Sequence, residues 1–256
     1  MLDSPGRKAG AVPFLRLWTT AVSSGWLHKV NYSNPARERV IVYNDGFNLY
    51  HGLKDSSLRS SRWLDIVGLC EAILLPHQDL HLVRYFTAIV KRDAQASGRQ
   101  TTYLDALVAT GGIEIHKGFY QVSNAKMKCH QCGDEQARCP SCKARYQRFE
   151  EKQSDVNMAL HLLADAEDDC YDTAMLITGD SDLVPAIALV KQRFPAKNVV
   201  AAFPPKRSGK HIAAVADAAL KIEPKHCRQN RLPPIVMTSS GVELHAPEGW
   251  LPAVQP

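Results

Sequence analysis

The sequence predicts an α/β fold built on a central, mainly parallel β-sheet. Between Arg39 and Ala219, short apolar runs bounded by Gly and polar residues alternate with segments whose apolar residues recur at helical spacing. Such alternation is typical of a parallel sheet with helices on both faces. Of the 256 residues, 45% are hydrophobic, which suffices for one substantial core with room for appendages. We therefore expect one main domain over residues 37–223.

The expected elements follow one another without an internal repeat. The run Val40–Asn44 is typical of a buried strand, and Trp63–Leu75 has the apolar spacing of an amphipathic helix. The same criteria predict strands in His81–Val90, Ile113–Tyr120, Ala174–Thr178 and Val199–Phe203, and helices in Thr101–Thr110, Asp155–Ala166, Leu183–Gln192 and His211–Ala219. In the helix that begins at Asp155, we expect the inward side chains to be Val156, Ala159, Leu160, Leu163 and Ala164.

Both ends of the chain lack this pattern. Residues 1–36 contain three prolines and no clear periodicity, so we expect a poorly ordered arm. Residues 224–256 are rich in proline and poor in periodic apolar residues, which is typical of a flexible tail. The most apolar early segment, residues 9–27, is broken by Pro13 and Arg16, so we expect no membrane span and no membrane partner.

Charge and cysteine content narrow the class of protein. The net charge of +5 is compatible with binding to nucleic acid but is weak evidence alone. Four of the seven cysteines lie between Cys129 and Cys142, whereas the other three are scattered. This distribution favours metal binding in a reducing compartment over a disulfide scaffold. We therefore expect a cytoplasmic protein.

Two aspartates stand where two expected strands end. Asp45 follows Val40–Asn44, and Asp180 follows Ala174–Thr178 after one glycine. Ligands of open α/β sheets bind just beyond the carboxyl ends of the strands. Together with Asp155, at the start of an expected helix, these residues would gather several carboxylates at one edge. Clustered carboxylates suit a hard divalent cation such as Mg²⁺ or Mn²⁺.

Glu151 and Asp182 are further candidates for this acidic cluster. Glu151 precedes Asp155 by four residues, so in a helix that begins early enough the two share one face. Each acid also has an ordinary interpretation, because Asp155 and Asp182 could cap helices and Glu151 could lie in solvent. For a single acid the ordinary interpretation is favoured. The presence of two strands that end in aspartate favours the metal interpretation for Asp45 and Asp180.

Three ordered motifs resemble the NYN domain, a branch of the PIN-like nucleases. They are Asp45-Gly46-Phe47-Asn48, Glu151-Lys152-Gln153-Ser154-Asp155-Val156 and Thr178-Gly179-Asp180-Ser181-Asp182. Residues 99–107 and 203–217 also resemble bacterial LabA-like members, and the resemblance covers about residues 39–222. The resemblance implies a PIN-like, three-layer fold and a metal-dependent nuclease, usually one that acts on RNA as an endoribonuclease.

The resemblance also implies roles for individual residues. The metal ligands for Mg²⁺ or Mn²⁺ would be Asp45, Asp155, Asp180 and Asp182, with Glu151 beside them, Asn48 orienting the metal shell or the substrate, and Thr178 and Ser181 supporting by hydrogen bonds. The cation could activate water and stabilise charge on phosphate oxygens, so no nucleophilic side chain is required. The chain departs from the family at Gln153-Ser154, where Gly-Val is common.

Two other functions compete with this interpretation. An RNA-binding adaptor with little catalytic activity would use the same cleft. A haloacid-dehalogenase-like phosphatase also has an aspartate after its first strand, but its mechanism needs a second aspartate two residues later as general acid. Phe47 occupies that position and cannot transfer protons, which disfavours the phosphatase.

A cysteine-rich insert at residues 124–148 interrupts the alternating pattern. Its two Cys-x-x-Cys pairs are Cys129 with Cys132 and Cys139 with Cys142. Four thiolates at this spacing predict one tetrahedral Zn²⁺ ion. Because four thiolates leave no open coordination position, the predicted zinc site is structural. Redox-active pairs are the alternative.

Basic residues predict where nucleic acid would bind. Lys206, Arg207 and Lys210 follow the last expected strand, and Arg145 and Lys152 lie at the end of the insert and just beyond it. Such residues can hold the phosphate backbone, although charged loops are often merely solvated. RNA is favoured over DNA, but recognition of the 2′-hydroxyl depends on site geometry. The sequence leaves open whether the chain forms a homo-oligomer.

Overall fold

A seven-stranded sheet forms the centre of the molecule, as seen in a computed structural model that describes residues 37–91, 93–128 and 132–253. Its strands are β1 (Glu38–Asp45), β2 (Gln78–Ala88), β3 (Ile113–Asn124), β6 (Gln147–Lys152), β7 (Thr173–Ile177), β8 (Asn198–Phe203) and β9 (Ala218–Lys221). The strand order is β6-β3-β2-β1-β7-β8-β9. Only β3 and β6 pair antiparallel; the other neighbours are parallel. The predicted α/β class and mainly parallel sheet are confirmed.

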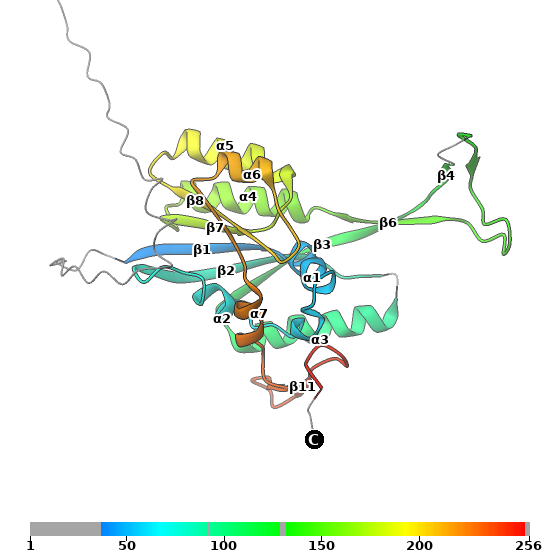
Figure 1. Ribbon diagram of the computed structural model, residues 1–256, viewed down its shortest axis with the longest axis horizontal. Helices are drawn as coiled ribbons and strands as arrows, with labels where there is room; N and C mark the ends of the chain where they lie inside the picture. Colours follow the sequence, from blue (N-terminus) through cyan, green and yellow to red (C-terminus); the bar gives the residue numbers. More distant parts are fainter. Residues whose placement is uncertain (1–36, 92, 129–131, 254–256) are drawn as a thin grey trace, which may run out of the picture. The chain divides into compact units, whose positions relative to one another are not determined.

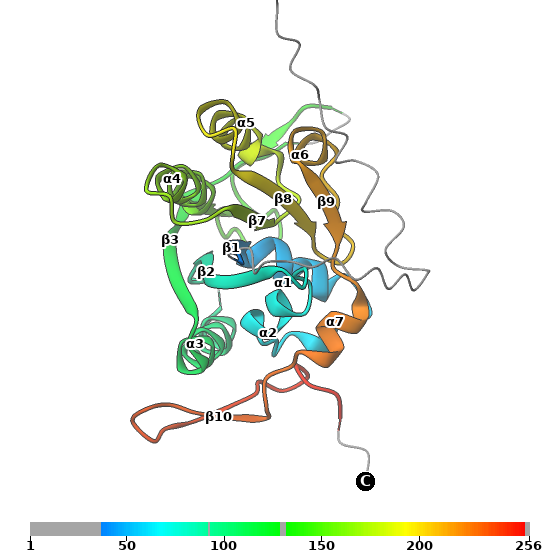
Figure 2. The ribbon, with the colours of Figure 1, turned by 90° about the vertical axis from the view of Figure 1, so that its left-hand side faces the viewer.

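Helices cover both faces of the sheet (Figures 1 and 2). On one face lie α1 (Gly46–Lys54), α2 (Ile66–Glu71), α3 (Ala94–Thr110) and α7 (Pro224–Gln229), with the short 3-10 helix η2 (Arg59–Ser61). On the other lie α4 (Ser154–Glu167), α5 (Val184–Arg193) and α6 (Lys210–Val215), with the 3-10 helix η3 (Ser181–Leu183) before α5. None of the helices in the described part of the chain is long and apolar enough to cross a membrane.

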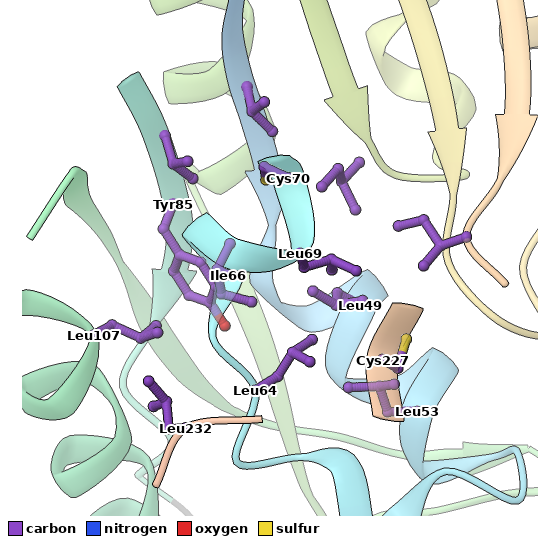
Figure 3. Close-up of a cluster of buried hydrophobic side chains, with 14 of the residues drawn as sticks. Leu49, Leu53, Leu64, Ile66, Leu69, Cys70, Tyr85, Leu107, Cys227 and Leu232 are labelled. Atoms are coloured by element: carbon purple, nitrogen blue, oxygen red, sulfur yellow. The ribbon is translucent and has the colours of Figure 1, made fainter. Parts of the chain in front are cut away.

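The central strands are buried on both faces because their side chains alternate between two hydrophobic clusters. In β1, Val40 and Val42 face the cluster under α1, α2 and α3, whereas Ile41 and Tyr43 face the cluster under α4 and α5. Figure 3 shows the first cluster, in which Leu49 of α1 and Leu69 of α2 lie together. This double burial explains why the strand reads as a continuous apolar run.

The segment after residue 223 is folded, so the expected flexible tail is wrong for residues 224–253. It contains α7 and the antiparallel pair β10 (Ile235–Met237) and β11 (Glu243–His245). Cys227 is fully buried, and Trp250 is only 4% exposed. A few large side chains placed far apart anchor this segment, so it lacks the periodicity by which helices and strands are recognised.

The inward face of α4 also differs from the prediction. Val156 and Leu160 are 61% and 60% exposed, and Ala164 is exposed as well. Met158 and Leu162 are buried instead. The inward face of α4 was predicted wrongly because it includes a charged residue, Asp165. The Asp165 carboxylate accepts hydrogen bonds from Arg84 (2.7 and 2.8 Å) and Tyr43 (2.5 Å). A buried charge must be paired in this way.

Two further elements departed from the prediction. The helix expected over His211–Ala219 ends at Val215, and residues 218–221 form the edge strand β9. The turn between them is held by Asp217, whose carboxylate and backbone N–H both bond to Val199 of β8. The second unexpected strand is β6, which returns along β3 from the cysteine-rich insert (Figure 1). Within the insert, β4 (Met127–Lys128) pairs with β5 (Glu135–Gln136).

Candidate functional site

The carboxyl end of β1 fixes the Asp45 side chain. Asp45 is the last residue of β1 and the N-cap of α1. One carboxylate oxygen accepts a hydrogen bond from the backbone N–H of Asn48 (2.9 Å), and the other accepts one from the hydroxyl of Thr178 (3.0 Å). The first turn of α1 therefore orients one oxygen, and the residue that follows β7 orients the other.

The loop after β7 is tied to the loop after β1. The Asn48 side-chain oxygen accepts a hydrogen bond from the Gly179 N–H (3.2 Å). The Thr178 hydroxyl accepts one from the Asp180 N–H (3.1 Å), and Asp180 caps η3 by accepting one from the Asp182 N–H (3.0 Å). These bonds place Asp180 and Asp182 close to Asp45.

Glu151 reaches the site from a strand and not from the helix of Asp155. Glu151 lies in β6, and the chain reverses at Gln153, whose φ of 76° is left-handed, before α4 begins. The expected shared helical face is therefore wrong. The reversal nonetheless brings Glu151 and Asp155 to the same cavity, and Ser154 donates a hydrogen bond to the Glu151 carboxylate. Gly118 of β3 lets the end of β6 pack closely against β3, because a Cβ at residue 118 would lie 2.3 Å from the Lys152 carbonyl oxygen.

One open cavity of about 250 Å³ collects these side chains. It is lined by Asp45, Phe47, Asn48, His51, Glu151, Asp155, Asp180 and Arg207. Asp182 is not in the lining, but carboxylate oxygens of Asp155, Asp180 and Asp182 lie within 4.8 Å of one another. Of the candidate acids, all five therefore gather at one edge of the sheet. Across the described ranges, no Lys, Arg or His forms an ion pair with any of them.

Burial and the neighbouring acids raise the pKa of three of these carboxylates, those of Asp45, Glu151 and Asp155. Burial, with a smaller contribution from Asp155 and Asp180, raises the pKa of Asp45 to about 6 despite its hydrogen bonds. Burial likewise raises the pKa of Glu151 to about 7, against the opposing hydrogen bond from Ser154. The pKa of Asp155 is raised by burial and then by Asp180 and Asp182. A divalent cation at this position would supply the missing positive charge.

Comparison with known proteins decides the family. Residues 39–223 match the NYN domain. The chain belongs to the NYN domain family. This membership points to nuclease activity and to action on nucleic acid, and it agrees with the resemblance of the sequence motifs.

Two proteins illustrate the relatives of this NYN domain. The 6-hydroxy-3-succinoylpyridine 3-monooxygenase HspA of Pseudomonas putida is 31% identical in an alignment that covers 62% of this chain and 57% of the relative. The chain thus spans little more than half the length of that protein. A solved structure, a protein of unknown function from Vibrio parahaemolyticus, has 19% identity and a TM-score of 0.44, covering 74% of this chain and 95% of that chain.

Of the five basic residues predicted to bind nucleic acid, one lines the acidic cavity and the others do not. Arg207 lines the acidic cavity and forms an ion pair with Asp55 (2.7 Å). Lys206 and Lys210 are exposed in the same segment. Lys152 pairs with Glu150 (2.9 Å), and Arg145 is exposed in the insert; neither lines the cavity.

Two lining residues of the NYN domain were missed as site residues. Phe47 and His51 are four residues apart on α1, and their rings lie 6.3 Å apart. Burial lowers the pKa of His51. The available signal was helical spacing, because His51 follows Asn48 by three residues and Phe47 by four, and residues three and four apart share one face of a helix.

The cysteine-rich insert is described except for residues 129–131, so the predicted ligand Cys129 lies outside the described residues. Cys132, Cys139 and Cys142 are free thiols. The residue after each Cys-x-x-Cys pair is left-handed, with φ of 76° at Gly133 and 60° at Lys143. Backbone N–H groups of Cys142 and Ser141 lower the pKa of the Cys139 thiol. Thiolates form more readily under such conditions, which suits metal binding.

Proposed function

We propose that this chain is a metal-dependent nuclease that hydrolyses phosphodiester bonds of RNA, as an endoribonuclease. One observation carries the proposal: carboxylates from β1, β6, α4 and the loop after β7 line one cavity, that of Asp182 lies beside them, and none of the five has a cationic partner in the described part of the chain. Such an arrangement is unfavourable unless a cation binds there. Its place at the carboxyl ends of two adjacent parallel strands is where ligands of α/β sheets bind.

The donor set fits Mg²⁺ or Mn²⁺. Hard cations prefer carboxylate oxygens, and an octahedral Mg²⁺ ion with bonds of about 2.1 Å holds its ligands at most about 4.2 Å apart. The oxygens of Asp155, Asp180 and Asp182 lie within 4.8 Å of one another, so small side-chain rotations would complete the set. Asp45, which lines the same cavity, would be the fourth ligand.

The chain's own residues would position the substrate and move a proton. The bound cation would activate a water molecule and neutralise charge on the phosphate oxygens. Glu151 lines the cavity beside the proposed ligands and would accept a proton there. Asn48 and Thr178 hold the two acid-bearing loops in register. Arg207, Lys206 and Lys210 would attract the phosphate backbone.

We propose in addition that the insert holds one structural Zn²⁺ ion through Cys129, Cys132, Cys139 and Cys142. Gly133 and Lys143, the residues that follow the two Cys-x-x-Cys pairs, both have a left-handed backbone. Each pair therefore ends in the same kind of turn, which supports the proposal. The Lys143 N–H also bonds to the Cys139 carbonyl (2.9 Å), which closes the second turn. Tetrahedral thiolate sites are built from two such turns.

A second candidate function is suggested by the curated relative. Its name describes oxygenation of a pyridine ring, and this chain has an apolar pocket beside the acidic cavity that could hold such a ring. Conversion of 6-hydroxy-3-succinoylpyridine in the presence of a reduced nicotinamide or flavin would favour that candidate. The third candidate, an RNA-binding adaptor, would bind RNA with the same cleft and leave it intact.

Cleavage of a labelled single-stranded RNA tests the nuclease proposal. The wild-type protein should cleave it with Mg²⁺ or Mn²⁺ and not with EDTA. Asp180→Asn should lower the rate at least about a hundredfold, because it removes one ligand charge and keeps the shape. Asp105→Asn is the matched control, since Asp105 is exposed on α3 and should leave the rate unchanged. Full activity of Asp180→Asn contradicts the proposal, and tight RNA binding without cleavage by the wild type supports the adaptor.

A further inference from the structure

A second, apolar pocket adjoins the acidic cavity. It has a volume of about 90 Å³ and is walled by residues of α1, β2, α3 and the segment after β11. Phe47 lines both the pocket and the acidic cavity, and Gly46, which also lines the pocket, follows Asp45 directly. The two spaces are therefore neighbours on either side of one α1 side chain. We call this space the aromatic pocket.

We propose that the aromatic pocket binds a nucleobase of the strand whose phosphate lies in the acidic cavity. The inference rests on the proposed nuclease function and adds a base-reading subsite to it. A nucleotide carries a planar ring next to its phosphate, and the molecule places an aromatic pocket next to an acidic, metal-binding cavity. One ligand can therefore occupy both.

The walls of the pocket are suited to stacking. Tyr50 and Phe47 are partly exposed, whereas Trp250 is 4% exposed and forms a fixed wall. The Trp250 ring lies 6.0 Å from that of Tyr50 and 5.7 Å from that of Tyr103, edge to face in the second case. Bases stack on such aromatic faces irrespective of sequence.

Two polar groups in the lining are free to meet a ligand. The Tyr85 hydroxyl has no hydrogen-bond partner, and Arg99 has neither a hydrogen bond nor an ion pair, with both statements confined to the described residues. Gln100, by contrast, is committed to Thr87, Ala88 and Val90. Gly46 admits the Tyr85 ring, because a Cβ there would lie 2.6 Å from it. Tyr85 could bond to a base edge, and Arg99 could pair with a phosphate.

Trp250 lies outside the region that matches the NYN domain, residues 39–223. Its backbone is tied to the main domain, since the Trp63 N–H reaches the Trp250 carbonyl (3.5 Å) and Arg62 donates a bond to the Gly249 carbonyl (3.0 Å). The Arg62 guanidinium also stands 5.2 Å from the Trp250 ring centre. The pocket is thus an addition that the folded C-terminal segment makes to the family domain.

Cleavage of RNA that carries one abasic nucleotide tests the proposal. The abasic site is moved along a single-stranded RNA one position at a time, with Mn²⁺ present. For the wild type we expect one position, fixed relative to the scissile bond, at which the loss of the base slows cleavage by about tenfold to a hundredfold. We expect slower cleavage of intact RNA in each of three variants, Tyr85→Phe, Arg99→Gln and Trp250→Ala. In each variant the abasic nucleotide at the sensitive position should also slow cleavage by a smaller factor than in the wild type.

The variants are chosen so that misfolding cannot hide the answer. Tyr85→Phe removes one hydroxyl and keeps the ring, and Arg99→Gln changes a side chain on the pocket rim. Arg228→Gln, in the exposed part of α7 and outside the pocket, is the matched control and should behave as wild type. A penalty that is equal at every position, or unchanged in Tyr85→Phe and Arg99→Gln, overturns the proposal.

A binding measurement without metal separates this proposal from the nuclease function. Calorimetry in EDTA should show that nucleoside monophosphates bind to the wild type and at least about fivefold more weakly to Tyr85→Phe, whether or not the protein cleaves RNA. If the wild type does not cleave RNA, the nuclease function is contradicted, but the calorimetric binding of nucleoside monophosphates still tests the nucleobase proposal. Binding of 6-hydroxy-3-succinoylpyridine without binding of nucleotides would overturn the nucleobase assignment.

Discussion

The Thr178 hydroxyl donates a hydrogen bond of 3.0 Å to the Asp45 carboxylate and thereby joins the ends of the adjacent strands β7 and β1. The same oxygen accepts the N–H of Asp180 at 3.1 Å. Thr178 is fully buried, so water cannot replace either bond. A single hydroxyl therefore sets the relative position of two of the proposed metal ligands.

Replacing Thr178 with valine should lower nuclease activity more than it lowers binding of RNA. The shape is kept, but Asp45 and the Asp180 N–H both lose a partner, which should destabilise the fold by about 1–3 kcal/mol. We expect kcat to fall about tenfold or more, because the carboxylates are no longer held in register. Thr178→Ser keeps the hydroxyl and should retain most activity. Equal kcat values for valine and serine would argue against this positioning role.

Metal ions should stabilise the protein. Repulsion among Asp155, Asp180 and Asp182 is relieved when a cation binds, so Mn²⁺ at a hundred times its Kd should raise the free energy of unfolding by about 2.7 kcal/mol. Thermal unfolding with and without Mn²⁺ measures this. The Mn²⁺ effect should be much smaller in Asp155→Asn, which should also be more stable than wild type in EDTA, and unchanged in Asp105→Asn. A full Mn²⁺ effect in Asp155→Asn would refute the ligand set.

The basic segment after β8 should contribute to RNA affinity. Replacement of Lys206, Arg207 and Lys210 by alanine removes three charges beside the acidic cavity. If each contacts one phosphate of a single strand, the slope of log affinity against log salt should fall by roughly 2. Fluorescence anisotropy with labelled RNA at several salt concentrations measures the slope. The matched control replaces Lys221, Lys225 and Arg228, which are exposed elsewhere; an equal change in both triple variants would show that net charge alone is responsible.

Two neighbouring histidines should make a destabilising contribution as the pH falls below neutral, opposite in sign to that of Asp45 and Glu151, whose raised pKa values favour the folded protein over the same range. The rings of His116 and His161 lie 4.1 Å apart, beside Arg84, with Glu114 and Asp165 as the facing acids. Burial first, and then His161 and Arg84, lower the pKa of His116; burial and then Arg84 lower that of His161.

The direction of this pH dependence follows from the lowered pKa values. Below about pH 6.5 these two histidines bind protons more readily in the unfolded chain than in the folded protein, so their contribution to the free energy of unfolding decreases as the pH falls. Urea unfolding of wild type and variants at pH 7.5 and 5.5 isolates this contribution. Relative to wild type, His161→Gln should become more stable on going from pH 7.5 to 5.5, whereas His245→Gln, which changes an exposed histidine, should follow wild type.

The insert should bind one zinc ion per chain. Elemental analysis of protein purified without chelator should find it, and Cys142→Ser should lower the zinc affinity because one of four thiolates is lost. The main sheet does not depend on the insert, so the unfolding midpoint should change little. Cys170→Ser is the matched control, outside the insert. Zinc retained at full affinity in Cys142→Ser would remove this cysteine from the proposed site.

The strand-end acids were predictable from the sequence because their positions depend on local patterns. Buried parallel strands are apolar on both faces, so Val40–Asn44 and Ala174–Thr178 stand out as runs, and the residues that follow them must lie at one edge. Asp155 was predictable for a similar reason, since it stands at the start of a helix. The family motifs agreed with this arrangement.

The other features of the site depend on contacts between segments that are distant in the sequence, and local sequence patterns do not predict such contacts. Glu151 enters the site because β6 pairs with β3 and the chain reverses at Gln153. The inward face of α4 depends on the pairing of Asp165 with Arg84, 81 residues away. Trp250 reaches Tyr50 and Tyr103 from a segment without periodicity. The sequence by itself determined the chain order of strands β1, β2, β3, β7 and β8, of helices α2 to α6, and the acids at strand and helix ends, because backbone propensity and the burial period act locally. Only the tertiary structure decided the entry of Glu151 into the acidic cavity and the aromatic pocket beside it, because both depend on segments that meet across the fold.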